Sequence, residues 1–248
     1  MVRPREGFIR EVRLQREKVA SFDRYPFAIP AVAGLRELPL HPQVTILVGE
    51  NGSGKSTLIE AIALAARFGP EGGTRNIHVA TQSSESELHQ YLMLVRGARR
   101  EKSGFFLRAE SLFNVATRVD DLGLGEYGWE SLHQKSHGEA FLWLLQNRFA
   151  PNGLYILDEP EAALSPQRQL AALAVMHDLI EKGSQFIMAT HSPILMAYPG
   201  ALIYRLDGDG LAPTRLEETE HYTVTRNFLL RPESFLKHLF DKDPGQTD

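Results

Sequence analysis

A glycine-rich segment with one lysine and one hydroxyl side chain carries the clearest chemistry in the sequence. Residues 49–56 read GENGSGKS, which matches the phosphate-loop pattern G-x-x-x-x-G-K-[ST]. The glycines let backbone N–H groups curl around phosphate oxygens. Lys55 would supply a positive charge to the β- and γ-phosphates, and the Ser56 hydroxyl is placed to coordinate Mg²⁺. A glycine-rich turn without a ligand is the alternative, which the strand before it and the helix after it disfavour.

Two acidic residues follow a second apolar segment. Residues 154–157 read LYIL and predict a buried strand, and Asp158 and Glu159 come directly after it. Ligands of open α/β sheets bind at the carboxyl ends of the strands. Asp158 is therefore suited to hold Mg²⁺, directly or through water, and Glu159 to polarise the attacking water. Two acids that face only a helix N-terminus or solvent are the alternative, which the upstream phosphate loop disfavours.

Two further polar elements could meet a phosphate at the same edge. Residues 136–139 read SHGE, where S-x-x-E is a capping box. The same helix start could present the Ser136 hydroxyl and the Gly138 N–H to a γ-phosphate. His191 follows a strand predicted over 186–189, where a neutral imidazole could hydrogen-bond the γ-phosphate or the attacking water. Taken alone, a cap and a core or surface histidine are the favoured interpretations.

The elements that position these residues alternate between strands and helices. Strands are expected at residues 8–16, 26–32, 44–48, 104–108, 154–157, 186–189, 201–206 and 211–215, and helices at 55–68, 136–149, 165–182 and 223–240. The alternation predicts an α/β fold with a mainly parallel sheet and right-handed crossovers. The first two strands are expected near an edge. The periodicity weakens from about residue 72 to 150, where we expect an inserted, mostly helical subdomain.

Length and composition favour one globular domain over residues 1–248. Apolar residues make up 43% and charged residues 23% of the chain, which excludes a collagen, a coiled-coil rod and a largely disordered protein. The chain contains no cysteine, so disulfides, thiolate zinc sites and cysteine nucleophiles are excluded. The charged N-terminal segment is unlike a secretory signal, and no apolar run approaches the roughly 20 residues of a membrane span. We therefore expect a cytoplasmic protein without an integral membrane segment.

The four chemical elements together resemble the ATP-binding cassette (ABC) superfamily. Within it, the chain resembles the soluble RecF- and SMC-type ATPases, and above all a group of small bacterial predicted ATPases. The shared segments are GENGSGKST, SHGE, LDEPEAALSPQRQ and ATHSPILMAYP, at residues 49–57, 136–139, 157–169 and 189–199. The resemblance covers essentially the whole chain. It implies an ABC-type P-loop NTPase fold with flanking helices and an N-terminal antiparallel edge.

The resemblance also implies roles for individual residues toward ATP and Mg²⁺. The implied nucleotide contacts are Gly49, Asn51, Gly52, Ser53, Gly54, Lys55, Ser56, Thr57, Ser136 and Gly138. Ser56 and Asp158 would bind the metal, Glu159 would be the catalytic carboxylate, and His191 the switch histidine. Residues 136–139 would be the signature motif, which acts on ATP held by a second subunit, and residues 162–165 the D-loop.

The chain departs from the family pattern at several positions. His137 and Glu139 replace Gly and Gln of the transporter signature, and Ser165 stands where the D-loop usually has Asp. No glutamine is clearly the Q-loop residue; Glu110 is the first candidate and Gln82 the second. The residue that contacts adenine is unassigned, with stacking on Arg24 or Tyr25 as the alternatives.

An ATPase switch is the function that these features favour, in which ATP-driven head-to-tail dimerisation acts on a partner. DNA is one candidate partner, because basic residues could form a phosphate-binding face: Arg3, Arg5, Arg10, Arg13, Arg96, Arg99, Arg100 and Lys102. The net charge of −4 is equally compatible with a solvated charged surface. The cytosolic ATP-binding subunit of a membrane transporter is one alternative. A low-turnover, nucleotide-gated scaffold for a toxin, nuclease or defence partner is another.

Overall fold

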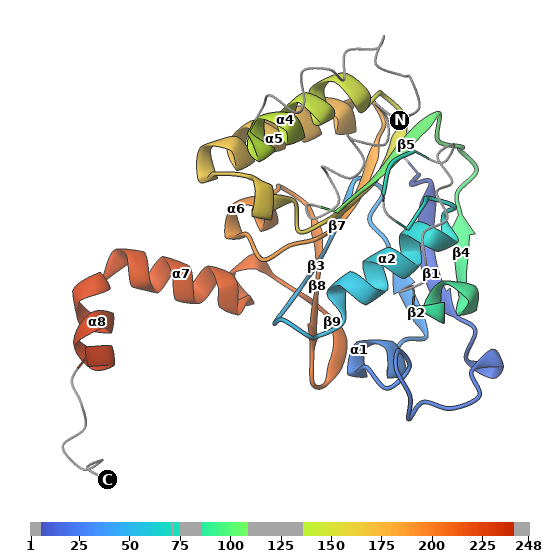
Figure 1. Cartoon of the computed structure of the whole chain (residues 1–248), viewed down its shortest axis with the longest axis horizontal. Coiled ribbons are helices and arrows are strands. Elements are labelled where there is room, and N and C mark those ends of the chain that lie inside the picture. The colour runs from blue at the N-terminus through green and yellow to red at the C-terminus, as the bar shows by residue number, and fades with distance from the viewer. Residues whose placement is uncertain (1–5, 71, 75–85, 109–135, 241–248) are drawn as a thin grey trace, which may run out of the picture.

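The computed structural model describes residues 6–70, 72–74, 86–108 and 136–240 (Figure 1). Its strands are β1 (Ile9–Leu14), β2 (Glu37–Pro39), β3 (Val44–Gly49), β4 (Leu92–Arg96), β5 (Ser103–Arg108), β6 (Gly153–Asp158), β7 (Gln185–Ala189), β8 (Leu202–Asp207) and β9 (Gly210–Thr214). Its α-helices are α1 (Pro30–Ala33), α2 (Lys55–Ala65), α4 (His137–Arg148), α5 (Pro166–Glu181), α6 (Pro193–Met196), α7 (Glu220–Leu230) and α8 (Pro232–Phe240).

A six-stranded sheet in the order β5-β6-β7-β3-β8-β9 forms the centre of the molecule. The strands from β5 to β8 run parallel, and β9 pairs antiparallel with β8. Every residue of β3, β6 and β7 is buried, which explains their continuous apolar runs. The predicted mainly parallel α/β sheet is confirmed. Because these strands are parallel, the residues that follow β3, β6 and β7 meet at one edge.

Different elements cover the two faces of this sheet. Successive side chains of β3 alternate, so Ile46 packs with α4 and α5, whereas Leu47 packs with α1 and α2. The face that carries α2 is also covered by a three-stranded antiparallel sheet in the order β2-β1-β4, which is the predicted N-terminal antiparallel edge. Figure 1 shows α4 and α5 side by side, away from α2. The helix after the phosphate loop and the helix after Ser136 therefore lie on opposite faces.

The prediction of a strand over residues 26–32 is wrong. This stretch contains the short helix α1, in which Pro30 stands in the first turn and Ala31 and Val32 are buried. A proline in the first turn loses no hydrogen bond and has the φ of a helix already set. Residues 37–39 form β2 instead and pair with β1.

The stretch 72–150 is not uniformly helical where the structure describes it. Residues 92–96 form β4, which pairs antiparallel with β1, and residues 103–108 form β5, which pairs with β6. Both strands belong to the two sheets, so residues 86–108 are part of the core fold and not of a helical insertion. Residues 109–135 lie outside the described residues, and their helical character stays a prediction.

Two predicted helices differ from the observed ones: one ends earlier than expected, and the other is divided in two. The helix predicted over 55–68 ends at Ala65, followed by Arg67 at a positive φ of 71°. The helix predicted over 223–240 is split into α7 and α8, because Pro232 lacks an N–H and disfavours a helical conformation at Arg231.

The helices α7 and α8 project from the body of the molecule (Figure 1), and neither contains a buried residue. They expose several large apolar side chains: Val224, Leu229, Leu230, Phe235, Leu236, Leu239 and Phe240. In the part of the chain that the structure describes, no helix is both long and apolar enough to cross a bilayer.

Candidate functional site

The phosphate loop joins the end of β3 to the start of α2. Gly52 and Gly54 have φ values of 81° and 95°, a region that L side chains rarely adopt. A Cβ at Gly54 would also lie 2.6 Å from the Ile29 side chain, whereas a Cβ at Gly52 would meet open space. The loop therefore needs glycine for its backbone at both positions, and for close packing at Gly54.

The lysine of the loop is turned onto the loop backbone. The Lys55 side chain is buried and donates hydrogen bonds to the carbonyl oxygens of Gly49 at 2.8 Å and of Glu50 at 2.9 Å. Burial lowers the pKa of Lys55, and the nearby carboxylates, Glu159 first among them, oppose this shift. The buried Ser53 hydroxyl oxygen has no hydrogen-bond partner among the described residues. A buried polar atom without a partner suits a loop that completes its hydrogen bonds with a ligand.

The Ser56 hydroxyl meets the first acid after β6. Ser56 Oγ donates to Asp158 Oδ1 at 3.2 Å, and Arg108 Nε lies 3.7 Å from Asp158 Oδ2. Burial raises the pKa of Asp158 to about 6, and the Arg108 charge is the main opposing influence. Ser56 and Asp158 provide two hard oxygen ligands, which fits Mg²⁺, an ion that usually keeps several waters and takes phosphate oxygens.

Arg108 is a neighbour of Asp158 that no sequence motif indicates. It ends β5, next to β6, and it also pairs with Glu60 of α2 at 2.9 Å. The available signal was a basic residue at the carboxyl end of a predicted strand. Glu110 and Gln82, the two Q-loop candidates, lie outside the described residues.

Glu159 and His191 face each other across the ends of β6 and β7. The Glu159 N–H donates to the Ala189 carbonyl at 2.9 Å, and Glu159 has the left-handed backbone angles φ 49° and ψ 50°. Such angles are strained for a residue with a side chain and cluster at functional sites. His191 Nε2 lies 3.5 Å from Glu159 Oε1. The structure thus brings both residues to the edge where Asp158 meets the phosphate loop.

Glu161 is a second residue whose contacts the motifs did not predict. It lies in the turn Pro160–Ala163 after β6 and accepts hydrogen bonds from the Thr190 hydroxyl at 2.7 Å and from the His191 backbone N–H. Glu161 therefore fixes the backbone from which the His191 side chain projects. The signal in the sequence was a third acid in the segment DEPE.

Ser136 caps α4 as predicted. Its N–H and its hydroxyl donate to Glu139 Oε2 at 2.9 and 2.8 Å. Arg168 of α5 donates to Ser136 Oγ at 3.1 Å and to Glu139 Oε1 at 3.0 Å. A Cβ at Gly138 would lie 2.7 Å from the Ala163 carbonyl oxygen, so glycine allows the helix start to approach the turn after β6. Arg168 was not foreseen, because the contact joins two elements that are distant in the sequence.

One of the two candidate adenine contacts lies beside the loop helix. The hydroxyl oxygen of Tyr25 is 3.5 Å from Thr57 Oγ1, and 66% of Tyr25 is exposed. Its ring is therefore available for stacking near the phosphate loop. Among the described residues, Arg24 makes no comparable contact with the loop.

The basic residues do not form an uninterrupted positive face where the structure describes them. Arg96 pairs with Glu101, and Arg10 pairs with Glu6. Arg13 pairs with Glu37 and also contacts Glu11. Arg3 and Arg5 lie outside the described residues. These ion pairs lower the charge that Arg10, Arg13 and Arg96 would present to a nucleic-acid backbone.

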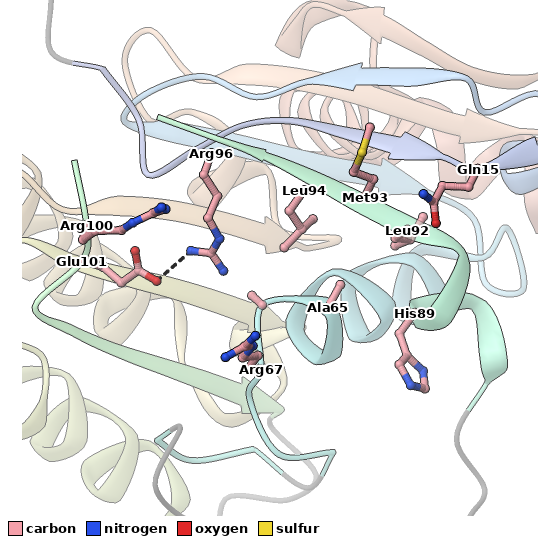
Figure 2. Close-up of a pocket in the computed structure, with 11 residues that line it drawn as sticks. Gln15, Ala65, Arg67, His89, Leu92, Met93, Leu94, Arg96, Arg100 and Glu101 are labelled. Carbon is pink, nitrogen blue, oxygen red and sulfur yellow. Dashed lines mark hydrogen bonds and ion pairs between the residues drawn. The ribbon is translucent and has the colours of Figure 1, made fainter. Parts of the chain in front are cut away.

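A pocket of about 630 Å³ lies at the far end of α2 from the phosphate loop (Figure 2). Its lining includes Arg67, Met93, Arg96 and Arg100, and Figure 2 shows the ion pair of Arg96 with Glu101 at its side. About 15 Å of helix separates Lys55 from this end, at 1.5 Å per residue. The pocket is therefore distinct from the site at the carboxyl edge of the sheet.

Comparisons with known proteins show which proteins the chain is similar to. The family described as "AAA domain" matches residues 26–105, and the family described as "AAA domain, putative AbiEii toxin, Type IV TA system" matches residues 125–197. The chain is 32% identical over 177 residues to the cytochrome c biogenesis ATP-binding export protein CcmA of Rhizobium johnstonii, covering 61% of this chain and 77% of that protein. It is 26% identical over 193 residues to an uncharacterized ABC transporter ATP-binding protein of Methanocaldococcus jannaschii, covering 67% and 83%.

Among solved structures, the SMC head domain from Thermotoga maritima matches with a TM-score of 0.46 and 14% identity, over 84% of this chain and 98% of that one. The family matches and the curated relatives confirm the predicted P-loop ATPase, which binds and hydrolyses nucleotide. The chain belongs to the ABC superfamily of P-loop ATPases.

Proposed function

We propose that this chain is a Mg²⁺-dependent ATPase in which two copies bind ATP head to tail, and in which hydrolysis releases the copies from each other. The placement of α2 and α4 on opposite faces of the sheet is the observation that carries this proposal. A phosphate held at the start of α2 lies on the other side from the start of α4 of the same chain. The Ser136 helix start would therefore act on nucleotide held by a second copy.

The loop residues would bind the phosphates. Lys55 would leave the carbonyl oxygens of Gly49 and Glu50 and donate to the β- and γ-phosphates, and the buried Ser53 hydroxyl would gain a partner. Ser56 and Asp158 would hold Mg²⁺, which when bound neutralises charge on the phosphate oxygens. Tyr25 would stack on adenine. The short distance between Ser56 and Asp158 supports this assignment.

Glu159 and His191 would act on the attacking water and the terminal phosphate. The ionised Glu159 carboxylate would orient and polarise the water, and His191 would donate a hydrogen bond to a phosphate oxygen. Phosphoryl transfer depends on position and charge neutralisation more than on covalent chemistry, so fixed side chains at this edge are sufficient machinery. The contact of 3.5 Å between the two residues supports a joint role.

The second copy would complete the site. Ser136 is exposed at the start of α4, where its hydroxyl and the Gly138 N–H could meet a γ-phosphate of the partner. Two such contacts in a two-fold arrangement bury two ATP molecules. Loss of the γ-phosphate removes the group that joins the halves, so the dimer would separate.

A variant that binds ATP but hydrolyses it slowly tests the proposal, because it should accumulate in the ATP-bound dimer. Glu159→Gln should bind ATP, hydrolyse it at least about 100-fold more slowly, and sediment or scatter light as a dimer in ATP-Mg²⁺. Lys55→Ala is the matched control, because it should lose phosphate binding and remain monomeric. A Glu159→Gln protein that stays monomeric at saturating ATP-Mg²⁺ would overturn the head-to-tail dimer.

The curated relatives support a second candidate function, the ATP-binding subunit of a membrane transporter. Their names describe ATP-binding proteins of transport systems. Co-purification of Glu159→Gln with an integral membrane protein in ATP-Mg²⁺ would favour this candidate. Capture of DNA in a salt-dependent manner would instead favour action on nucleic acid, although the ion pairs of Arg10, Arg13 and Arg96 weaken that face.

A further inference from the structure

The His191 ring is held by a second histidine, which comes from the C-terminal helix α7. His191 Nδ1 lies 2.8 Å from His221 Nε2, and the two ring centroids are 4.9 Å apart. His191 follows β7, whereas His221 is the second residue of α7. No motif in the sequence singles out His221, and the proposed role of His191 does not require a contact at its Nδ1.

This contact decides which nitrogen of His191 carries the proton. Two facing ring nitrogens form a hydrogen bond only if one donates and the other accepts. If His191 donated from Nδ1, its Nε2 would present a lone pair to the ionised Glu159 carboxylate 3.5 Å away. If His221 donates from Nε2, His191 carries its own proton on Nε2 and directs an N–H toward Glu159. Electrostatics selects the second arrangement.

The selected N–H of His191 lacks a full hydrogen bond. His191 Nε2 is buried and has no hydrogen-bond partner among the described residues. Its separation of 3.5 Å from Glu159 Oε1 is longer than an ordinary N–H···O hydrogen bond. A buried donor in this state is ready for an acceptor that enters beside Glu159.

The surroundings of His221 lower its pKa and so favour its neutral form. Burial is the first cause that lowers the pKa of His221, and His191 and Lys55 lower it further. Glu50 and Glu220 act in the opposite direction without reversing the shift. A neutral His221 that carries its proton on Nε2 can donate to His191.

The start of α7 is anchored although the rest of the helix is exposed. Thr219 is 1% exposed and caps α7: its hydroxyl oxygen accepts from the Tyr222 N–H at 3.4 Å and donates to the Leu216 carbonyl at 2.7 Å. His221 and Glu50 of the phosphate loop both line a cavity of about 210 Å³. His221 is thus held beside the nucleotide site by its own helix cap.

We propose that His221 is a positioning residue that holds His191 as the tautomer protonated on Nε2, so that His191 presents an N–H to a terminal phosphate oxygen or to the attacking water. The role of His191 toward nucleotide rests on the function proposed above. The tautomer does not, because the contact between His221 and His191 is a property of the chain itself.

Nitrogen-15 spectra of the histidine rings test the tautomer without nucleotide. The His191→Asn spectrum identifies the His191 signals by their loss. At pH 8 the wild-type protein should show His191 protonated on Nε2 and an Nδ1 signal shifted by the hydrogen bond that Nδ1 accepts from His221. His221→Ala should lose that shift and gain a share of the tautomer protonated on Nδ1. His191 protonated on Nδ1 in the wild type, or an Nδ1 signal that is unchanged in His221→Ala, would overturn the proposal.

Kinetics of two variants test the consequence for hydrolysis. His221→Ala should lower kcat roughly tenfold, the scale of one lost hydrogen bond, with little change in KM for ATP. His221→Gln keeps an N–H near the position of Nε2 and should recover most of kcat. Equal kcat in wild type and His221→Ala would overturn the proposal.

The dimer assay separates this proposal from the function on which it rests. In the Glu159→Gln background, His221→Ala should still form the ATP-dependent dimer. A Glu159→Gln protein that fails to dimerise contradicts the proposed function, whereas the tautomer measurement still stands or falls on its own.

Discussion

The buried Asp158 carboxylate lowers the free energy of unfolding at neutral pH, and its proposed role as a metal ligand explains why it is there. Its carboxyl is 5% exposed, and burial raises its pKa from 3.8 to about 6. The folded protein therefore holds this proton up to a higher pH than the unfolded chain does. The free energy of unfolding should fall as pH rises from about 4 to about 6, and this stability stays lost above pH 6. Binding of Mg²⁺ requires the ionised form, so protons should compete with the metal below pH 6.

Asp158→Asn should accordingly stabilise the protein without nucleotide and metal while it weakens binding of ATP-Mg²⁺. The expected gain at pH 8 is at most roughly 3 kcal/mol, because the shift is about two pKa units at 1.36 kcal/mol each. Urea unfolding at pH 8 and at pH 4 checks this, since the gain should vanish at the lower pH. Asp209→Asn, at an exposed turn, is the control with the same change in charge. A less stable Asp158→Asn protein at pH 8 would contradict the account.

Alanine substitutions at Gly52 and Gly54 separate two reasons why the phosphate loop needs glycine: its backbone angles and its close packing. Alanine at either position must adopt a left-handed φ, which costs about 1 kcal/mol. Alanine at Gly54 also meets Ile29, so Gly54→Ala should lose about 3 kcal/mol in urea unfolding and Gly52→Ala about 1 kcal/mol. Equal losses in the two variants would show that the contact with Ile29 does not matter.

Site residues could be predicted when they belong to one continuous motif. Lys55, Ser56 and Asp158 were predicted in this way, and the structure places Ser56 against Asp158. Arg108 and His221 could not be identified, because each contact depends on packing between elements that are far apart in the sequence. Periodicity and spacing in a sequence indicate local structure and do not predict contacts between distant elements.

At the scale of elements, buried parallel strands were the most predictable. Their apolar runs, such as residues 44–48 and 186–189, suit strands inside a sheet covered on both faces, and these strands are fully buried. The strand β4 was missed because its partner is β1, about 80 residues earlier, and half-buried antiparallel strands have a weaker signal. The strand prediction for residues 26–32 was wrong because Pro30 favours the first turn of a helix over a strand.

The contact between α4 and α5 makes a prediction for the dimer. Arg168 holds both Ser136 and Glu139, so Arg168→Met should leave the Ser136 helix start poorly fixed. In the Glu159→Gln background it should weaken the ATP-dependent dimer roughly tenfold while ATP binding by the monomer is retained. Sedimentation over a range of protein concentrations measures this. The control is Gln167→Met, an exposed change on the same helix; equal dimer affinity in the two variants would contradict the role of Arg168.

At the scale of the whole molecule, the two faces of the sheet divide the proposed site between copies. The phosphate loop with α2 and the Ser136 start of α4 are both intact in one chain, yet they lie on opposite faces. One chain can therefore bind nucleotide but would need a partner to close over it. This division is the central claim of the account.

Cross-linking tests that claim most directly, because the chain has no cysteine of its own. One Glu159→Gln protein carries Glu50→Cys, in the phosphate loop, and a second carries Ser136→Cys. A short bismaleimide should join the two different variants when they are mixed with ATP-Mg²⁺, and neither variant should cross-link to itself. Cross-links between two chains that both carry Ser136→Cys, or cross-linking of the mixture that is independent of ATP, would contradict a head-to-tail dimer closed by nucleotide.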